Sequence, residues 1–323
     1  MTNYKKKLII GSRASQLAMA QTNDFINKLL KAYPDMEREA IEIKTIKTSG
    51  DLNQTSRLDQ MGGKGLFAKE IEKEILDGTI DVGVHSMKDM PAIENEDLMI
   101  GCWLEREDYR DCLLSISSSS LTDLKSKAVV GTSSIRRRSQ ILNLRNDLCI
   151  KSLRGNVDTR IKKLNDNFFD AIILSVAGLQ RLSLTHLIRN TFDEDEILPA
   201  ACQGAVGIQM LSSNRDLKLF LGTLNHSQTE TKCRTERSVL RKINANCNSP
   251  IGLLVTIEND QIILRCDIFN HNGDKIFTAC LEDHIAQSEK LGQVMSNNIL
   301  SSLGQELIDN LDVLKNDFDY TPS

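Results

Sequence analysis

Residues 129–140, VVGTSSIRRRSQ, lead from two apolar residues through a glycine and three hydroxyl residues into three consecutive arginines. The apolar pair predicts a short strand, Gly131 a turn, and the hydroxyl cluster the start of a helix. A helix N-terminus presents free backbone N–H groups and favours anions. Successive helical residues fan by about 100°, so we expect two of the three arginines to share a pocket. Exposure of all three to solvent is equally compatible with this segment alone.

This segment belongs to a longer alternation of strands and helices, which is typical of a largely parallel sheet covered by helices. One half of the pattern has predicted strands at 8–10, 41–48 and 80–84, with helices at 15–31 and 66–76. A similar half has strands at 129–130, 150–153 and 171–174, with helices ending near 145 and at 156–164. Ile9-Ile10-Gly11-Ser12 and Val129-Val130-Gly131-Thr132 therefore look like equivalent openings of two lobes.

The last third of the chain changes character. A helix is predicted at 231–243, followed by strands at 251–257, 261–269 and 274–281 and a closing helix from about residue 286. Asn272-Gly273 is a strong hairpin signal between the last two strands. The pattern predicts a small α+β domain.

Composition narrows the class of ligand. The 323 residues are 40% hydrophobic and 26% charged, as in ordinary soluble multidomain proteins. A net charge of −4 and only 4% aromatic residues argue against a nucleic-acid-binding protein. Residues 125–165 nevertheless hold eleven Lys/Arg against two acids, which favours an anionic small molecule. MGGKGLF (61–67) is not a nucleotide-binding P-loop, because Gly65 stands where a Ser or Thr is required.

The apolar runs and the cysteines indicate the compartment. No stretch of eighteen apolar residues occurs, and the apolar run at 8–10 is too short for a signal peptide, so we expect a cytoplasmic protein. The eight cysteines lack metal-binding spacing, and we expect no metal site. Most should be buried thiols, including Cys149, Cys266 and Cys280. Cys247, in the polar loop NANCNSPIG, is instead a candidate nucleophile or attachment point.

Further arginines follow other predicted strands. Arg154 comes directly after the strand at 150–153, Arg160 lies in the next helix, and Arg13 has the equivalent place in the first half. Ligands bind beyond the carboxyl ends of parallel strands, so these side chains are candidates for one site. Arginine binds carboxylates bidentately, and each charge-assisted bond contributes roughly 1.5–3 kcal/mol. We therefore expect a ligand with several carboxylates.

Asp89 is the one acid in HSMKDMP (85–91), just past another predicted strand. Facing arginines, it should stay ionised, which suits accepting N–H bonds and stabilising a cation. A turn aspartate before Pro91 is equally compatible with the segment. His85 is more typical of a structural histidine than of a base.

Eight motifs follow one another along the chain: GSRASQLAMAQT, GGKGLFAKEIE, GVHSMKDMP, GTSSIRRRSQ, LRGNVDTRIKKL, DAIILSVAGLQRL, LPAACQGAVGIQ and NCNSPIG. Their order and combination resemble the porphobilinogen deaminases, also called hydroxymethylbilane synthases. The resemblance implies an α/β protein with two lobes like type II periplasmic binding proteins and a small α+β C-terminal domain. It places lobe 1 at 1–105 plus about 204–222, lobe 2 at 110–199 and the cofactor-attachment domain at 228–323.

The resemblance also implies an activity: a transferase that joins four porphobilinogen molecules head to tail, with loss of ammonia, into hydroxymethylbilane for haem and chlorophyll biosynthesis. It implies a dipyrromethane cofactor held by a thioether to Cys247, with Asp89 as the catalytic residue. The other expected cofactor-binding residues are Ser86, Lys88, Thr132, Ser134, Arg136, Arg137 and Arg154. The expected substrate-binding residues are Arg13, Ser15, Lys64, Arg160 and Arg181.

The expected partners are porphobilinogen and the growing pyrrole chain, with no nucleic acid, no membrane and a monomeric state. The alternative is a non-catalytic two-lobed binding protein for polycarboxylate anions. An exported protein of that kind should carry a signal peptide, and it would have no use for a third domain presenting Cys247.

Overall fold

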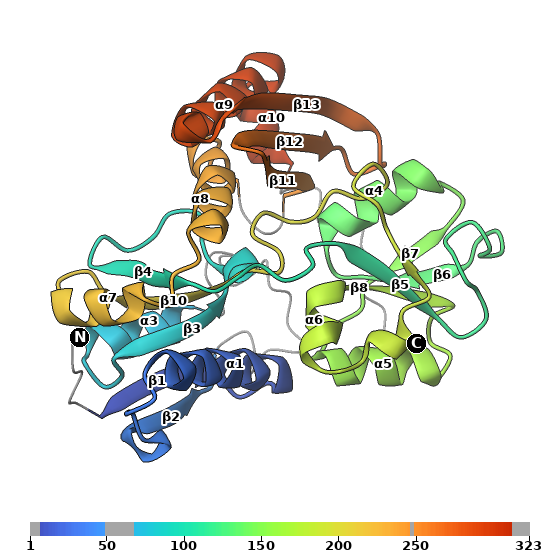
Figure 1. Ribbon diagram of the computed structural model, residues 1–323. Helices are drawn as coiled ribbons and strands as arrows, with labels where there is room; N and C mark the ends of the chain where they lie inside the picture. The colour runs from blue at the N-terminus through green and yellow to red at the C-terminus, as the bar shows by residue number, and fades with distance from the viewer. Residues whose placement is uncertain (1–6, 49–67, 246–248, 312–323) are drawn as a thin grey trace. The chain divides into compact units, whose positions relative to one another are not determined.

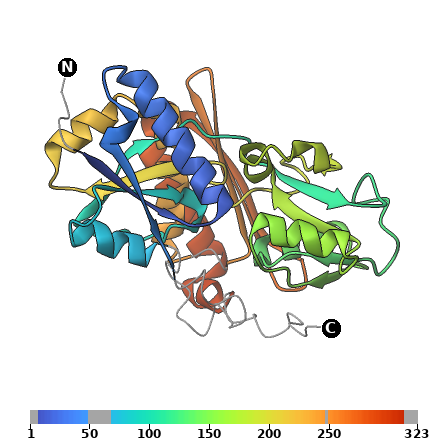
Figure 2. The ribbon, with the colours of Figure 1, turned by 90° about the horizontal axis from the view of Figure 1, so that it is seen from below.

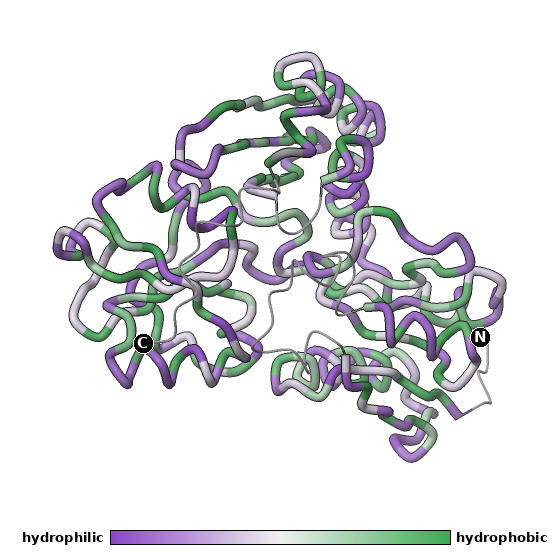
Figure 3. Tube along the Cα trace, turned by 180° about the vertical axis from the view of Figure 1, so that it is seen from behind, coloured by the Kyte–Doolittle hydropathy of each residue, from purple (hydrophilic) through white to green (hydrophobic). Residues whose placement is uncertain are grey.

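The computed structural model describes residues 7–48, 68–245 and 249–311 (Figure 1). The chain forms two compact units, of which unit 1 comprises residues 1–107 and 204–231 and unit 2 comprises 108–203 and 232–323. Hydrophobic and hydrophilic stretches alternate along both units (Figure 3), as expected for elements that bury one face. None of the helices in the described ranges combines the length and apolar character that a membrane span requires.

Unit 1 is built on a five-stranded sheet with the order β2-β1-β3-β10-β4. Its strands are β1 (Leu8–Arg13), β2 (Ile41–Ile46), β3 (Val82–Ser86), β4 (Leu98–Trp103) and β10 (Val206–Leu211). β1 pairs in parallel with β2 and β3, whereas β10 runs antiparallel between β3 and β4. Its helices are α1 (Gln16–Ala32), η1 (Arg38–Ala40), α3 (Lys69–Leu76), η2 (Met87–Asp89) and α7 (Arg215–Gly222).

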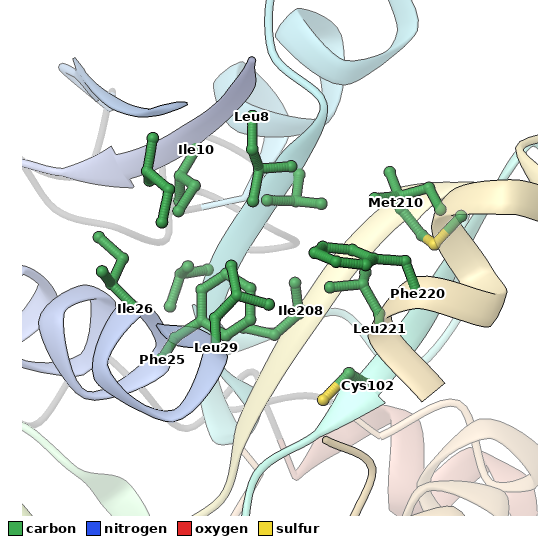
Figure 4. Close-up of a cluster of buried hydrophobic side chains, with 14 of the residues drawn as sticks. Leu8, Ile10, Phe25, Ile26, Leu29, Cys102, Ile208, Met210, Phe220 and Leu221 are labelled. Carbon is green, nitrogen blue, oxygen red and sulfur yellow. The ribbon is translucent and has the colours of Figure 1, made fainter. Parts of the chain in front are cut away.

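The core of unit 1 lies between the sheet and helices α1 and α7. Phe25 and Leu29 of α1 recur with helical spacing and pack with Ile208 of β10 and Phe220 of α7 (Figure 4). Figure 2 shows α1, the long blue helix, running across one face of this sheet. The Ser15 side chain begins α1 by accepting a hydrogen bond from the Ala18 N–H. The Ser15 cap sets the start of α1 directly after β1, and the core holds the helix against the sheet.

Unit 2 contains a second five-stranded sheet, with the order β7-β6-β8-β5-β9. Its strands are β5 (Asp111–Ser115), β6 (Val129–Gly131), β7 (Cys149–Lys151), β8 (Ala171–Ser175) and β9 (Asn190–Thr191). Its helices are α4 (Ile135–Leu144), α5 (Val157–Asn165), α6 (Val176–Arg181) and η3 (Thr185–Leu187). β6 is parallel to β7 and β8, and β5 runs antiparallel between β8 and β9.

The two sheets share one topology. β1 lies between β2 and β3, just as β6 lies between β7 and β8. The antiparallel strand β10 separates β3 from the edge strand β4, just as β5 separates β8 from β9. β1 with Gly11 and β6 with Gly131 hold the same position, so the predicted equivalence of the two openings is confirmed. The predicted α/β class is also confirmed, with two lobes of equivalent topology and an additional α+β part.

The additional part is an antiparallel sheet with the order β11-β12-β13. It consists of β11 (Ile251–Glu258), β12 (Gln261–Phe269) and β13 (Lys275–His284), with η4 (Ile285–Gln287), α8 (Ser227–Lys242), α9 (Ser288–Leu303) and α10 (Gln305–Asn310). Gly273 makes the predicted turn between β12 and β13 with a φ of 92°. Because this sheet and lobe 2 form one compact unit, the finer boundaries of three domains remain a prediction.

Glu236 of α8 holds several parts of unit 2 together. The side chain is fully buried, and its two carboxylate oxygens accept the N–H groups of Cys202, at 2.5 Å, and Val255, at 2.8 Å. A backbone bond from Leu253 to Pro199 of 2.9 Å lies beside them. One carboxylate thus joins α8, β11 and the segment that leaves lobe 2.

Two cysteine predictions are wrong. Cys149 and Cys280 are exposed. Cys149 begins the edge strand β7, and Cys280 lies at one of the exposed positions that alternate along the edge strand β13. Cys266, on the central strand β12, is buried as predicted. Cys247 lies outside the described residues.

Removing the Glu236 carboxylate should leave two buried N–H groups without acceptors. Each such group costs about 1–3 kcal/mol, so Glu236→Ala should lower the free energy of unfolding by about 2–6 kcal/mol in urea titrations. Glu236→Gln should have a smaller effect because its carbonyl oxygen still accepts one bond. Glu282→Ala, at an exposed position, is the control and should change little. An unfolding energy for Glu236→Ala within 0.5 kcal/mol of wild type, roughly the range of ordinary surface substitutions, would contradict this account.

Candidate active site

The unit 1 candidates gather at the carboxyl ends of two neighbouring parallel strands. Arg13 ends β1, Ser86 ends β3, and Lys88 and Asp89 lie in η2 directly after β3. All four are half-buried. The amide of Gln21 in α1 donates to Ser86 Oγ at 2.8 Å, so the helix that Ser15 caps also holds Ser86. β1 and β3 pair directly, which brings these side chains to one edge of the sheet.

His85 lies among these residues as an uncharged group. Burial lowers its pKa to about 4; a bond with Gln209 opposes the shift, and the charge of Arg13 adds to it. Gln209 in turn donates to Glu72 Oε1 at 3.0 Å. The ring is therefore neutral at neutral pH, which agrees with a structural histidine and not with a general base.

In unit 2, the opening stretch 129–140 forms the predicted strand, turn and helix. Ser134 is the N-cap of α4, and its Oγ accepts the Arg137 N–H at 3.4 Å. Thr132 Oγ1 accepts the Ser134 N–H at 3.2 Å, and the Thr132 N–H donates to Lys151 O at 3.0 Å. The two hydroxyls thus satisfy donors of this helix start, so arginine side chains supply most of its attraction for anions.

Arg136 and Arg137 are 3% and 5% exposed and share one counterion, the carboxylate of Asp111 at the start of β5. Arg136 Nη1 lies 2.7 Å from Oδ2, and Arg137 Nη2 lies 2.7 Å from Oδ1. Arg138 turns away, and its Nη1 donates to His271 O at 2.6 Å. The alternative in which all three arginines face solvent is therefore wrong.

Asp111 is a residue to which sequence reasoning gave no role. The signal was a single acid opening the apolar strand DCLLS. Burial opposes its ionisation, but the charges of Arg136 and Arg137 outweigh that effect and hold the pKa of Asp111 below its ordinary value. Two guanidiniums and one carboxylate leave this buried cluster with a net positive charge. Arg136 Nε has no hydrogen-bond partner within the described ranges.

The remaining unit 2 arginines follow the neighbouring strands. Arg154 comes three residues after β7, Arg160 lies in α5 and Arg181 ends α6, which follows β8. All three are half-buried, and Arg160 Nε donates to Gly155 O at 2.8 Å. Ser133 Oγ donates to Leu153 O at 2.6 Å and thereby ties the segments that leave β6 and β7. Arg154 thus lies at the same edge of the sheet as the start of α4, and Arg160 is near the start of the helix that follows.

Two candidates have no described position, since Lys64 and Cys247 lie outside the described residues. The described chain reaches Ala245, which is buried after α8, and resumes at Ser249, which is buried before β11.

Comparison with known proteins identifies the family. Residues 8–219 match the family described as "Porphobilinogen deaminase, dipyromethane cofactor binding domain", and residues 230–301 match "Porphobilinogen deaminase, C-terminal domain". The chain belongs to the porphobilinogen deaminase family. A porphobilinogen deaminase of Bacillus cereus is 41% identical over 305 residues, which cover 94% of this chain and 97% of the relative.

A second relative supports this membership. A porphobilinogen deaminase of Chlorobium chlorochromatii is 44% identical over 269 residues, covering 83% of this chain and 85% of the relative. A solved ABC-transporter periplasmic substrate-binding protein of Coxiella burnetii shares 13% identity at a TM-score of 0.42, over 67% of this chain and 91% of its own. A likeness that distant identifies neither a ligand nor a function.

The buried His85 should make stability depend on pH. Its pKa rises from about 4 in the folded chain to about 6.5 on unfolding, so between these values only the unfolded chain binds the proton. The free energy of unfolding should therefore decrease by up to about 3 kcal/mol as the pH falls from 6.5 to 4. His85→Gln should flatten this part of the curve, whereas His186→Gln, at an exposed position, should follow wild type. Identical curves for wild type and His85→Gln would refute the assignment.

Proposed function

We propose that this chain condenses four porphobilinogen molecules head to tail, releasing one ammonia at each addition, and that water then releases the finished chain as hydroxymethylbilane. The observation that carries the proposal is the buried, net positive Arg136–Arg137–Asp111 cluster, which lies within the match to the family's cofactor-binding domain. Porphobilinogen carries an acetate and a propionate, so a growing chain accumulates carboxylates. Arginines at several strand ends suit such a ligand.

We propose that a dipyrromethane is attached to Cys247 through a thioether. The other proposed cofactor-binding residues are Ser86, Lys88, Thr132, Ser134, Arg136, Arg137 and Arg154. The described residues fit an anionic group, because Arg136 keeps an Nε–H without a partner in the described chain. When bound, the cofactor supplies the pyrrole carbon onto which the first substrate is added. The proposed substrate-binding residues are Arg13, Ser15, Lys64, Arg160 and Arg181.

Asp89 has the proposed catalytic role. Loss of ammonia from porphobilinogen leaves an electrophilic carbon conjugated to a pyrrole, whose ring N–H becomes a strong donor. A carboxylate fixed in η2, directly after β3, is suited to accept that N–H bond and to offset the developing positive charge. Half-burial of Asp89 strengthens this interaction relative to one in water.

The alternative of a non-catalytic anion-binding protein receives no support from the comparisons, since the curated relatives carry an enzyme's name. A cytoplasmic location and a monomeric state are part of the proposal, as the sequence predicts.

If Asp89 stabilises the cation, Asp89→Asn should fold normally and lose at least about 100-fold in kcat, the scale seen when one electrostatic stabiliser is removed. Asp89→Glu should keep a small residual activity because the charge survives. Asp97→Asn, at an exposed position in the same unit, should retain full activity. A kcat for Asp89→Asn close to that of wild type would exclude Asp89 from the reaction.

The attachment to Cys247 predicts a mass. Intact wild-type protein should weigh more than its sequence by two linked pyrrole units, and the added mass should survive reductant and denaturant because a thioether is not exchanged by thiols. Cys247→Ser should have the mass of its sequence, whereas Cys149→Ser and Cys280→Ser, at exposed thiols, should carry the adduct. Active wild-type protein without added mass would disprove the attachment.

A further inference from the structure

We infer that Asp111 is a positioning residue of the carboxylate site: it sets the orientation of Arg136 and Arg137 and leaves one net positive charge for the ligand. This inference deepens the proposed function and rests on it. It concerns a residue that would not itself touch the ligand and would act through the two arginines.

The two oxygens of the Asp111 carboxylate contact different arginines. Oδ2 lies 2.7 Å from Arg136 Nη1. Oδ1 accepts bonds from Arg137 Nε at 3.1 Å and Nη2 at 2.7 Å, and from Gln203 Nε2 at 2.8 Å. A guanidinium is a rigid plane, so holding one edge fixes the direction of its remaining donors. One carboxylate therefore orients two neighbouring guanidiniums.

Backbone carbonyls complete this arrangement. Arg136 Nη1 also donates to Leu198 O at 2.7 Å, and Arg137 Nη1 donates to Ile173 O at 3.0 Å. Both arginines are thus held on one side by fixed acceptors. Arg136 Nε is buried and has no hydrogen-bond partner within the described structure, so it is an unsatisfied donor that a ligand carboxylate would satisfy.

The net charge of the Arg136–Arg137–Asp111 cluster is the second argument for this role of Asp111. Two adjacent guanidiniums buried without a counterion would repel each other and lose hydration. A second carboxylate would make the cluster neutral and remove its attraction for anions. With the single carboxylate of Asp111, the cluster is stable before any ligand arrives and still bears one positive charge.

Asp111 also joins the arginines to the two segments that connect the units along the chain. It lies three residues after unit 2 begins at Asp108, and Gln203 is the last residue before the chain returns to unit 1. Gln203 Nε2 donates to Tyr109 O at 2.7 Å as well as to Asp111. The position of the carboxylate is therefore set by both connections.

A purely structural ion pair would predict lower stability and nothing else. The test therefore measures cofactor loading, which is the rate at which apo-protein incubated with porphobilinogen gains the mass of two pyrrole units. Near-UV circular dichroism selects the variants that fold. Asp170→Asn is the matched control, because Asp170 binds the Val129 N–H at 2.7 Å and Lys125 at 3.0 Å in the same lobe and contacts neither Arg136 nor Arg137 by a hydrogen bond or ion pair.

Asp111→Asn should load at least tenfold more slowly than wild type and show a raised KM for porphobilinogen in its loaded fraction. Asp111→Glu should recover part of the rate, because the charge returns. Asp170→Asn should lose thermal stability but load at the wild-type rate. Loading of Asp111→Asn within twofold of wild type would overturn the inference.

Should Asp111→Asn fail to fold, Asp111→Glu and Arg137→Lys provide the test as single variants and as a pair. Because Asp111 acts through Arg137, the loss of loading rate in the pair should be at least threefold smaller than the product of the single losses. Multiplicative losses would contradict the inference. Wild-type protein that never gains pyrrole mass would instead contradict the proposed function, so the two failures are distinguishable.

Discussion

The arrangement of β5 and α4 in unit 2 depends on the ion pairs of one buried carboxylate, Asp111, with Arg136 and Arg137. Asp111 can remain ionised at zero exposure only because Arg136 and Arg137 lie against it, and they can be buried only because it is there. This mutual requirement fixes the start of β5 next to the first turn of α4. It also explains why the antiparallel strand of this sheet begins with an acid.

The same edge of each sheet collects the groups that attract anions. Parallel strands bring their carboxyl ends together, so residues far apart in sequence become neighbours there. In unit 2, hydroxyls of Thr132 and Ser134 satisfy N–H groups at the start of α4, and the arginines supply the charge. In unit 1, Arg13, Lys88 and the acid Asp89 occupy the equivalent edge. Each edge holds an acid, but the two acids differ: Asp111 of unit 2 is buried and paired with Arg136 and Arg137, whereas Asp89 of unit 1 is half-buried. This difference separates carboxylate binding from the proposed charge stabilisation.

The local pattern of 129–140 predicted its own strand, turn and helix, because each signal there is short-range. β5 was not predicted, because it lies inside its sheet and its short run DCLLS carries no alternation. β10 was missed as well, although Val206, Ile208 and Met210 alternate with Gly207 and Gln209. The role of Asp111 was not predicted, because its partners Arg136 and Arg137 are 25 and 26 residues away along the chain and come close to it only in the folded sheet. The exposure of Cys149 and Cys280 depends on which strands lie at the sheet edges and which face of each strand is covered, and the sequence of a single strand reveals neither.

The segment that leaves lobe 2 is where these constraints meet. Gln140 of α4 exchanges two hydrogen bonds with the backbone of Leu198, and Arg136 donates to the same carbonyl. Glu236 of α8 holds the N–H of Cys202, four residues later, which adopts a φ of 59° that non-glycine residues seldom adopt. Side chains of α4 and α8 therefore both form hydrogen bonds with the backbone of residues 198–202. The positive φ of Cys202 is tolerated because buried side chains from both helices hold this stretch, and the same contacts fix the start of α4 relative to α8 within unit 2.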